Sequence, residues 1–254
     1  MDELKEYKLF AQKLAKISGK IIKGYFRTNI SVYSKSDQSP VTIADKKAEE
    51  LMRSAIMKNF PDHGIIGEEF GNYNDNAEYQ WILDPIDGTK SFICGALTFG
   101  TLIALTKKGK PILGVINQPV LNEFLIGDNK TALLNGTAVK VRNNSKLSDS
   151  VLLTTDHLNI EKYQDIDNFN TLIQKVKLYR NWGDCYGYYL VATGFADIMI
   201  DPDMSIWDSM ALIPVIRGAG GTITDYHGND PVTGKSIIAA GSSKLHEEVI
   251  KILN

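Results

Sequence analysis

The stretch WILDPIDGT, at residues 81–89, places two aspartates three residues apart directly after an apolar run. The run predicts a buried strand, and we expect this strand to end at Asp84 because Pro85 has no N–H to donate to a central β-ladder. Asp84 and Asp87 would then both lie on irregular backbone at the tip of the strand, where binding chemistry tends to sit. Two carboxylates this close repel each other unless a hard divalent cation such as Mg²⁺ binds them. The stretch therefore predicts a magnesium site.

Gly88 and Thr89 follow the second aspartate directly. They would open a helix or turn whose backbone N–H groups point at an anion. A metal site and an anion cradle within a few residues of each other predict phosphate chemistry.

The composition of the 254 residues limits what the chain can be. This length suits one large domain or two subdomains that share a site, and 43% hydrophobic residues can bury a substantial core. The net charge of −2 gives no electrostatic basis for binding nucleic acid or a membrane surface. Two cysteines are too few for a disulfide framework, and no apolar run approaches the roughly 20 residues of a membrane span. The acidic N-terminus is unlike a signal peptide, so we expect a cytoplasmic protein.

Hydrophobic periodicity predicts the order of helices and strands. Helices are expected over residues 4–25, 43–59, 165–175, 186–194, 209–217 and 246–253. Strands are expected over residues 30–33, 64–67, 81–84, 100–105, 112–116, 123–127, 151–154, 177–179, 196–200, 222–225 and 236–240. Residues 100–141 are typical of an antiparallel meander, with Asn135-Gly136 as a hairpin turn. Residues 37–40 are expected to form a polar turn and residues 72–78 a polar loop.

The change from a meander to alternating helices and strands predicts a subdomain boundary at residues 143–149. We expect residues 1–145 to form an N-terminal α+β subdomain that carries most metal ligands. Residues 146–254 would form a C-terminal α/β subdomain that completes the site. The two would pack as a single compact unit.

Five segments carry residues of the kinds that bind metals and phosphates, and we expect them to converge. They are Lys35 with Asp37, residues 39–42 and Asp45; residues 67–69; residues 84–89; Arg180 with residues 183–186; and Asp201 with Trp207-Asp208 and residues 218–221. Taken singly, most of them have a structural explanation: Glu68 and Glu69 are typical of solvated loops, and Asp45 and Asp208 of helix caps. The aspartate pair at the strand tip is harder to explain in this way, because acids at the end of an apolar strand cost stability.

In this order the segments resemble the inositol monophosphatase superfamily, of the lithium-sensitive type, over residues 35–221. Two signatures carry the resemblance, one at residues 81–92 and one from Trp207-Asp208 to Gly220-Gly221. Arg217 departs from it, because the family often has an acid there, at a position that is not thought to hold metal. The resemblance implies an α/β (α+β) fold, a layered αβαβα sandwich of the inositol monophosphatase and fructose-1,6-bisphosphatase type. It also implies a homodimer.

The resemblance implies two or three Mg²⁺ ions held by oxygen atoms, with Mn²⁺ as a substitute. The implied ligands are Glu68, Asp84 and the carbonyl of Ile86 for one ion, Asp84, Asp87 and Asp208 for a second, and Asp45 with Glu68, through water, for a weaker third.

The same resemblance assigns the catalytic groups. Thr89 and Glu68, with Asp45 nearby, would orient and deprotonate the attacking water, and the amides of Gly88 and Thr89 would hold the phosphate. The implied reaction is direct hydrolysis of a phosphate monoester without a phosphoenzyme.

Asp184 distinguishes this chain from inositol-specific members, which typically have small residues after the glycine of this segment. Together with Asp201 it adds negative charge near the expected leaving-group pocket, where Asp87 and Arg180 would also contact the substrate. A neutral polyol needs no second carboxylate, whereas an ammonium or imidazolium would gain a charge-assisted hydrogen bond of about 1.5–3 kcal/mol. The structural alternative is that Asp184 caps the helix that follows it.

Residues 88–93, 99–105, 114–121 and 182–188 also resemble the histidinol-phosphate phosphatase branch. Residues 96–97 depart from it, since a proline usually follows Gly95. This resemblance implies hydrolysis of L-histidinol phosphate to L-histidinol and phosphate, a step of histidine biosynthesis.

Other functions stay open on the same scaffold. One is an inositol-1-phosphate or broad-specificity sugar-phosphate monophosphatase, and another is a non-catalytic binding or regulatory protein. A nucleotide 3′-phosphatase or fructose bisphosphatase is disfavoured. Either enzyme would favour extra basic residues near the pocket to bind a second phosphate, and Lys90 and Arg180 are the only obvious candidates in the sequence.

Overall fold

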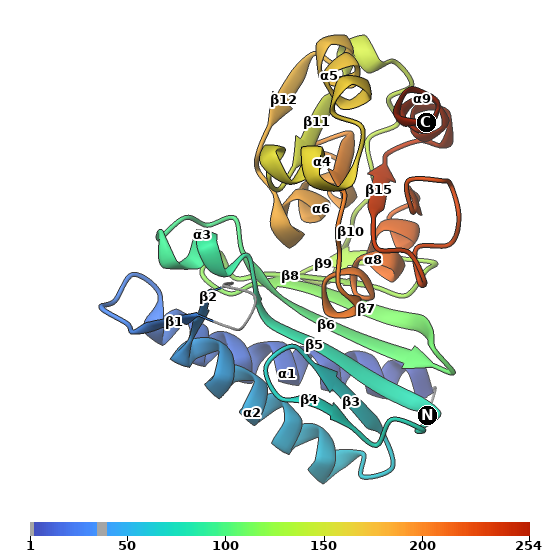
Figure 1. Cartoon of the computed structure of the whole chain (residues 1–254). Coiled ribbons are helices and arrows are strands. Elements are labelled where there is room, and N and C mark those ends of the chain that lie inside the picture. Colours follow the sequence, from blue (N-terminus) through green and yellow to red (C-terminus); the bar gives the residue numbers. More distant parts are fainter. Residues whose placement is uncertain (1–2, 35–39) are drawn as a thin grey trace.

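Helical layers and β-sheets alternate through the molecule in the order α, β, α, β, α (Figure 1). The computed structural model describes residues 3–34 and 40–254 of the chain. Lys35, Asp37 and Ser39, which we expected near the site, lie outside the described residues, as does most of the expected turn at residues 37–40. The layered αβαβα fold that the sequence predicted is confirmed.

The first helical layer consists of α1 (Glu3–Tyr25) and α2 (Ile43–Asn59), both at the predicted positions. Helix α2 begins after Thr42 because this residue caps it: the Thr42 side chain accepts the N–H of Ala44, and the Asp45 side chain accepts the backbone N–H of Thr42. Two short antiparallel strands, β1 (Val32–Ser34) and β2 (Pro40–Thr42), lie next to this helix, and β2 ends at the cap residue.

An eight-stranded sheet lies on this layer. Its strands, in spatial order, are β10 (Thr137–Ala138), β9 (Ala132–Leu134), β8 (Glu123–Gly127), β7 (Lys110–Gln118), β6 (Gly100–Lys107), β5 (Tyr79–Asp87), β3 (Gly64–Gly67) and β4 (Gly71–Tyr73). The meander from β6 to β10 is confirmed, and positive φ angles at Asn135 and Gly136 give the predicted hairpin turn.

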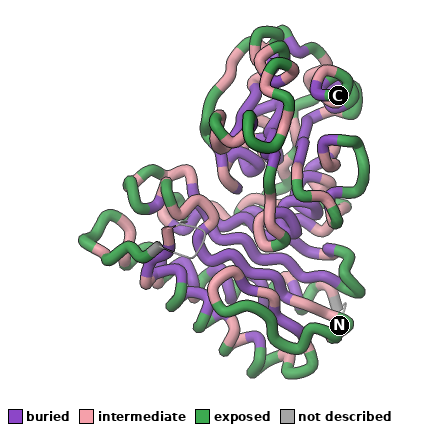
Figure 2. The backbone as a smooth tube through the Cα atoms, in the orientation of Figure 1, coloured by how far each residue is buried: buried purple, intermediate pink, exposed green. Residues whose placement is uncertain are grey.

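Side chains on the central strands alternate between two cores, as the pleat requires. Trp81 and Leu83 pack with α1 and α2, whereas Ile82 between them packs on the opposite face with the helices of the middle layer. Both faces of the central strands are therefore covered, and Figure 2 shows them as a continuous buried band.

Strand β5 corrects our prediction that it ends at Asp84, because it continues to Asp87. Asp84 pairs with Leu102 of β6 and Asp87 with Gly100, so the strand carries one extra residue between these pairs. This bulge accommodates Pro85, which a regular central ladder would exclude.

The middle layer is helical and lies between the two sheets. It consists of α6 (Asp184–Ala192), α7 (Ile206–Ser209) and α8 (Leu212–Gly218). The short helix α3 (Thr89–Ile93) lies beside this layer, and its Phe92 packs with residues of α1 and α2. The helix expected over residues 209–217 is thus two helices, the first of which starts earlier, because Ser205 caps α7. The helix expected from residue 186 also starts earlier, at Asp184.

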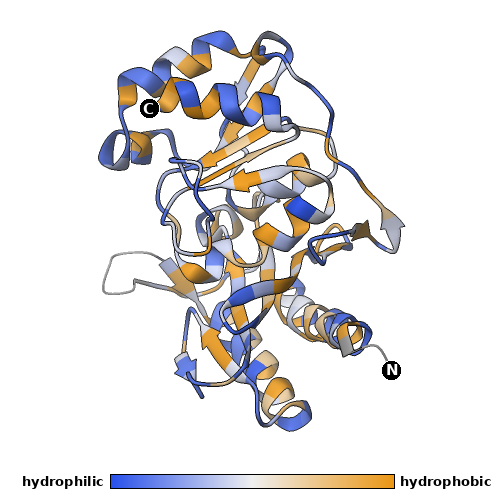
Figure 3. Cartoon of the chain, turned by 90° about the vertical axis from the view of Figure 1, so that its right-hand side faces the viewer, coloured by the Kyte–Doolittle hydropathy of each residue, from blue (hydrophilic) through white to orange (hydrophobic). Residues whose placement is uncertain are grey.

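The second sheet has five strands, in the order β12 (Leu178–Arg180), β11 (Val151–Thr154), β13 (Ile198–Asp201), β15 (Ile237–Ala240) and β14 (Thr222–Thr224). The outer layer on it consists of α4 (His157–Tyr163), α5 (Ile166–Lys175) and α9 (Ser243–Leu253). Helix α4 and strand β4 were not predicted; β4 occupies part of the expected loop at residues 72–78. Figure 3 shows hydrophobic and hydrophilic residues on the same outer helices, and their apolar residues pack on the sheet.

The two halves are joined through residues 139–150, which include a short 3₁₀ turn at Leu147–Asp149. Arg142 in this segment donates hydrogen bonds to the carbonyls of Gly194 and Phe195 and pairs with the buried Asp197. None of the described helices has the length and apolar character needed to cross a membrane.

Candidate active site

The bulge of β5 orients the groups that follow the apolar run. The carboxylate of Asp84 accepts a hydrogen bond from the N–H of Ile86 at 3.0 Å, which closes a tight turn around Pro85. The hydroxyl of Thr89 donates to the carbonyl of Ile86 at 3.0 Å. Gly88 has φ of +88°, a left-handed conformation that favours glycine, and it starts α3 at Thr89. The predicted helix after the aspartates is confirmed.

Asp208 reaches the aspartate pair from α7. The N-cap of α7 is Ser205 rather than Asp208, and one oxygen of Asp208 accepts the N–H of Ser205 at 2.8 Å to complete the capping box. The same carboxylate also belongs to a cluster with Asp84 and Asp87, in which one oxygen of each lies within 4.8 Å of the others. Helix capping and a place in the cluster are therefore compatible in this residue.

Glu68 follows β3, the strand that runs parallel to β5. Its N–H donates to the carbonyl of Leu83 at 3.2 Å, which continues the pairing one residue past the strand. Its side chain contacts that of Asp84. The structure thus brings together all the carboxylates expected to hold two metal ions.

The electrostatics of this cluster favour a bound cation. Burial raises the pKa of Asp84 well above its usual range, and the negative charges of Glu68, Asp87 and Asp208 raise it further. Burial and neighbouring carboxylates raise the pKa of Asp208 to about 7. Buried carboxylate oxygens with uncompensated negative charge are the donor set that a hard divalent cation requires, so these residues fit Mg²⁺ or Mn²⁺.

Asp45 lies fully buried in the first turn of α2. One oxygen accepts the N–H of Thr42 at 2.9 Å and its hydroxyl at 2.6 Å, which confirms the cap interpretation. Within the described part of the chain, the second oxygen is buried without a hydrogen-bond partner. Burial raises the pKa of Asp45 to about 6, and the charge of Glu69 contributes.

Glu49 supports the segment that carries Glu68, and sequence reasoning missed it. It is a fully buried carboxylate one turn after Asp45 on α2. Its oxygens accept the N–H of Glu69 at 2.8 Å and that of Phe70 at 3.2 Å. A charged residue on the apolar face of a predicted helix was the available signal.

A cavity of about 130 Å³ adjoins the cluster on the side of the second sheet. Its walls are strongly acidic, and its lining residues are Asp87, Thr155, Asp156, Asn159, Asp184, Asp201, Pro202, Asp203, Met204 and Asp208. We call it the acidic cavity. It contains two of the predicted substrate residues, Asp184 and Asp201, beside the predicted metal ligands.

Asp201 ends β13 at this cavity and is held on both sides. One oxygen accepts the N–H of Thr155 at 3.1 Å, and the other accepts the hydroxyl of Tyr188 at 2.9 Å. Burial nevertheless raises the pKa of Asp201 to about 7. The hydrogen bonds fix the orientation of this carboxylate at the wall of the cavity.

Asp184 does not cap the helix that begins with it, so the expected capping role is wrong. The N-cap is Gly183, and Asp87 performs the capping by accepting the N–H of Cys185. Asp184 itself has φ of +50°, a strained conformation for a residue with a side chain. Its carboxylate accepts the hydroxyl of Ser91 at 3.3 Å.

The Asp184 carboxylate also lies close to the expected phosphate cradle. A Cβ added to Gly88 would come within 2.8 Å of it. Burial raises the pKa of Asp184 to about 6, against the opposing effects of Ser91 and Lys90.

The remaining predicted residues lie elsewhere. Arg180 is exposed on β12, where its guanidinium donates to the carbonyl of Tyr179 at 2.7 Å, and it does not line the acidic cavity. Gly218 and Gly221 pack against the backbone of residues 131 and 240 rather than against the cluster.

Comparison with known proteins agrees with this geometry. The family model described as the inositol monophosphatase family matches residues 3–254. The chain belongs to this family.

Two relatives of this inositol monophosphatase family member are named as phosphatases. A chloroplastic bifunctional phosphatase, IMPL2, from Arabidopsis thaliana is 45% identical over 99% of this chain and 76% of its own length. A histidinol-phosphatase from Chlorobaculum parvum is 40% identical over 92% of this chain and 91% of its own. Among solved structures, an inositol monophosphatase from Zymomonas mobilis superposes with a TM-score of 0.89 at 34% identity, covering 100% of this chain and 99% of that one.

Family membership and the carboxylate cluster together identify the chain as a metal-dependent phosphomonoesterase. Its substrate is a phosphate ester, as the family implies.

Proposed function

We propose that this phosphomonoesterase hydrolyses L-histidinol phosphate to L-histidinol and phosphate. The observation that carries the proposal is the orientation of Asp184: this carboxylate serves no cap, keeps a strained backbone and faces the start of α3 from the acidic cavity. An amine or imidazolium of a substrate would neutralise it. The names of the Arabidopsis and Chlorobaculum relatives support the same choice.

We assign the metal ligands as the family resemblance implies. Glu68, Asp84 and the Ile86 carbonyl would hold one Mg²⁺, Asp84, Asp87 and Asp208 a second, and Asp45 with Glu68 a weaker third. When bound, Mg²⁺ would neutralise the phosphate charge and increase the acidity of water.

The chain's own residues would position the reactants. The amides of Gly88 and Thr89 would hold the phosphate, while Glu68 and the Thr89 hydroxyl would orient the attacking water and the Glu68 carboxylate would accept its proton. Asp87, Asp184 and Asp201 contact the leaving group. Water oxygen forms a bond to phosphorus as the ester oxygen leaves and takes up a proton, without a phosphoenzyme. A role for Arg180, a homodimer and a cytoplasmic location stay predictions from the sequence.

The test compares kcat/KM for L-histidinol phosphate and inositol 1-phosphate with Mg²⁺ on one preparation. We expect a clear preference for histidinol phosphate. Asp184→Asn should lower kcat/KM for this substrate about 10- to 150-fold, the equivalent of one charge-assisted hydrogen bond. The same substitution should change kcat/KM for inositol 1-phosphate much less.

Two results would overturn the proposal. Equal loss on both substrates would make Asp184 a structural residue, and a preference for inositol 1-phosphate would favour the inositol or sugar-phosphate alternative. The non-catalytic alternative has a separate test, since a cellular function that survives Asp87→Asn would not depend on turnover.

A further inference from the structure

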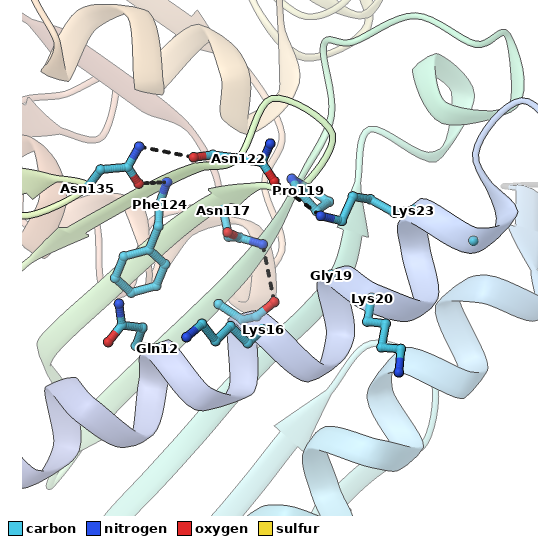
Figure 4. A pocket seen from close by; sticks show the side chains of 12 residues that line it. Gln12, Lys16, Gly19, Lys20, Lys23, Asn117, Pro119, Asn122, Phe124 and Asn135 are labelled. Carbon is cyan, nitrogen blue, oxygen red and sulfur yellow. Dashed lines mark hydrogen bonds between the residues drawn. The ribbon is translucent and has the colours of Figure 1, made fainter.

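A second cavity, larger than the acidic cavity, lies between α1 and the ends of β7 and β8 (Figure 4). Its volume is about 680 Å³, within the range of small-molecule sites. The residues that line it are Gln12, Ala15, Lys16, Gly19, Lys20, Lys23, Gly24, Asn117, Pro119, Asn122, Phe124 and Asn135. We call it the α1 cavity.

The α1 cavity is positively charged. Lys16, Lys20 and Lys23 are spaced four and three residues apart, which places them on one face of α1. The Lys23 ammonium donates to the side chain of Asn122 at 3.2 Å, a neutral acceptor that leaves its charge uncompensated. Among the twelve described lining residues there is no aspartate or glutamate. The α1 cavity therefore attracts anions.

The wall opposite α1 is rigid, so the cavity is preformed. The side chain of Asn135 accepts the N–H of Phe124 at 3.0 Å and donates to the carbonyl of Asn122 at 3.0 Å, which ties two turns together (Figure 4). Gln118 accepts the N–H groups of Val120 and Leu121 at 2.7 and 3.1 Å. A ligand would meet this wall without first having to order it.

The floor of the α1 cavity combines a polar and an apolar group. Asn117 is buried, and its amide nitrogen makes one long contact, 3.5 Å, to the carbonyl of Ala15, although an amide nitrogen has two hydrogens to donate. Phe124 presents its ring to the same space (Figure 4). A flat apolar body on Phe124 would leave an attached anionic group within reach of the lysines.

The position of the α1 cavity separates it from catalysis. The large sheet lies between α1 and the middle-layer helices, and its two faces pack in separate cores. The α1 cavity lies on the α1 side of this sheet, whereas the acidic cavity lies on the side of the second sheet. The α1 cavity is thus no extension of the substrate pocket.

We propose that the α1 cavity is a second small-molecule site, which binds an organic anion with a flat apolar body and a carboxylate, sulfonate or phosphate group within reach of Lys16 and Lys23. The proposal is independent of the substrate of the acidic cavity.

The test uses 8-anilinonaphthalene-1-sulfonate, a flat anion that a phosphatase cannot hydrolyse, with the Mg²⁺-loaded protein. Binding is measured by fluorescence titration and located by a crystal structure of the complex. The double variant Lys16→Gln/Lys23→Gln should weaken binding by about tenfold or more, since it removes two charged donors. Gly24→Met should also weaken binding, because a Cβ at Gly24 meets nothing within 4 Å and the new side chain has room to enter the cavity.

Matched controls separate a built site from general affinity for the probe. Lys13→Gln removes a charge from the same helix outside the cavity, where its ammonium lies over the Phe10 ring, and should leave binding unchanged. N-phenyl-1-naphthylamine, which lacks the sulfonate, should bind much more weakly. Equal binding in the double variant, an equal loss in Lys13→Gln, or a probe located elsewhere would each overturn the proposal.

Discussion

Glu49 links the first helical layer to the proposed chemistry through two backbone hydrogen bonds. Its side chain lies against Gly67, where a Cβ would come within 1.9 Å of a Glu49 oxygen, so a glycine is required for this approach. Arg53 pairs with Glu49 at 3.2 Å and donates to the carbonyl of Gly71 at 2.8 Å. The turn between β3 and β4, which carries Glu68, is therefore fixed at both ends by α2.

Glu49→Gln should slow turnover without unfolding the protein. The amide keeps one acceptor but loses the charge that pairs with Arg53, so the turn shifts relative to Asp84. Misplacement of a catalytic group by a fraction of an ångström predicts a fall in kcat of roughly 10- to 100-fold. The Mg²⁺ concentration for half-maximal activity should rise as well, because Glu68 is a proposed ligand.

Glu50→Gln is the matched control, since Glu50 is the exposed neighbour on the same helix. It should leave kcat and the Mg²⁺ dependence unchanged. Wild-type kinetics in Glu49→Gln would show that α2 does not position Glu68.

Asp208→Asn separates the two functions of this carboxylate. The asparagine oxygen still accepts the N–H of Ser205, so α7 keeps its cap and the melting temperature with Mg²⁺ absent should not fall. The charge next to Asp84 and Asp87 is lost, and kcat should fall to well below a tenth of the wild-type value, as it should for Glu68→Gln. Retention of a tenth of kcat in either variant would contradict the assigned ligands.

Close packing of α8 on the large sheet depends on glycines in the strands. A Cβ at Gly114 of β7 would lie 2.0 Å from the carbonyl oxygen of Ala211, directly before α8. Backbone cannot yield as a flexible side chain does, so Gly114→Ala should lower the free energy of unfolding by about 1–3 kcal/mol or more.

Gly24→Ala is the counterpart within helix α1. A Cβ there meets nothing within 4 Å, and the change should raise the free energy of unfolding by about 0.5–1 kcal/mol through helix propensity. Urea unfolding of the two variants measures both effects. A similar change in the free energy of unfolding in Gly114→Ala and Gly24→Ala would mean that the packing of α8 on β7 does not limit stability.

The elements that sequence patterns predicted best are those with local causes. Helix α2 begins where expected because Thr42 and Asp45 form its N-terminal capping box within a few residues. The bulge in β5 was missed because it depends on β6, whose pairing changes register opposite Pro85. The break between α7 and α8 was missed for a similar reason. It lies at Met210 and Ala211, where the backbone of Ala211 packs closely on Gly114 of β7, a residue distant in the sequence.

For the whole molecule, the carboxylate cluster was predictable from the aspartate pair after an apolar run and, for Glu68 and Asp208, from the family resemblance. Its surroundings were not. Glu49 gains its role only because α2 packs beside the turn after β3, and Asp184 lies beside Gly88 although the two are far apart in the sequence. The charge contrast between the acidic cavity and the α1 cavity likewise depends on tertiary packing of distant segments.

The carboxylate cluster also predicts how pH controls the stability of the whole molecule. Without metal, Asp208 has a folded pKa of about 7 against a usual value of 3.8, so the folded state holds a proton that the unfolded state has lost. Its contribution to stability is complete below pH 3.8 and is lost as pH rises through 7. Bound Mg²⁺ replaces this proton, and therefore stabilises the protein more at high pH.

Melting temperatures with and without Mg²⁺ at pH 5.5 and pH 8 test this linkage. Displacement of one proton between pH 5.5 and the pKa of Asp208, about 7, weakens Mg²⁺ stabilisation at the lower pH by about 2 kcal/mol. For a chain of this length that difference corresponds to about 4–8 °C in the melting temperature. NaCl at equal ionic strength should give no such difference, because screening does not require deprotonated ligands. An equal Mg²⁺ shift at both pH values would mean that the ion binds away from the cluster of Asp84, Asp87 and Asp208.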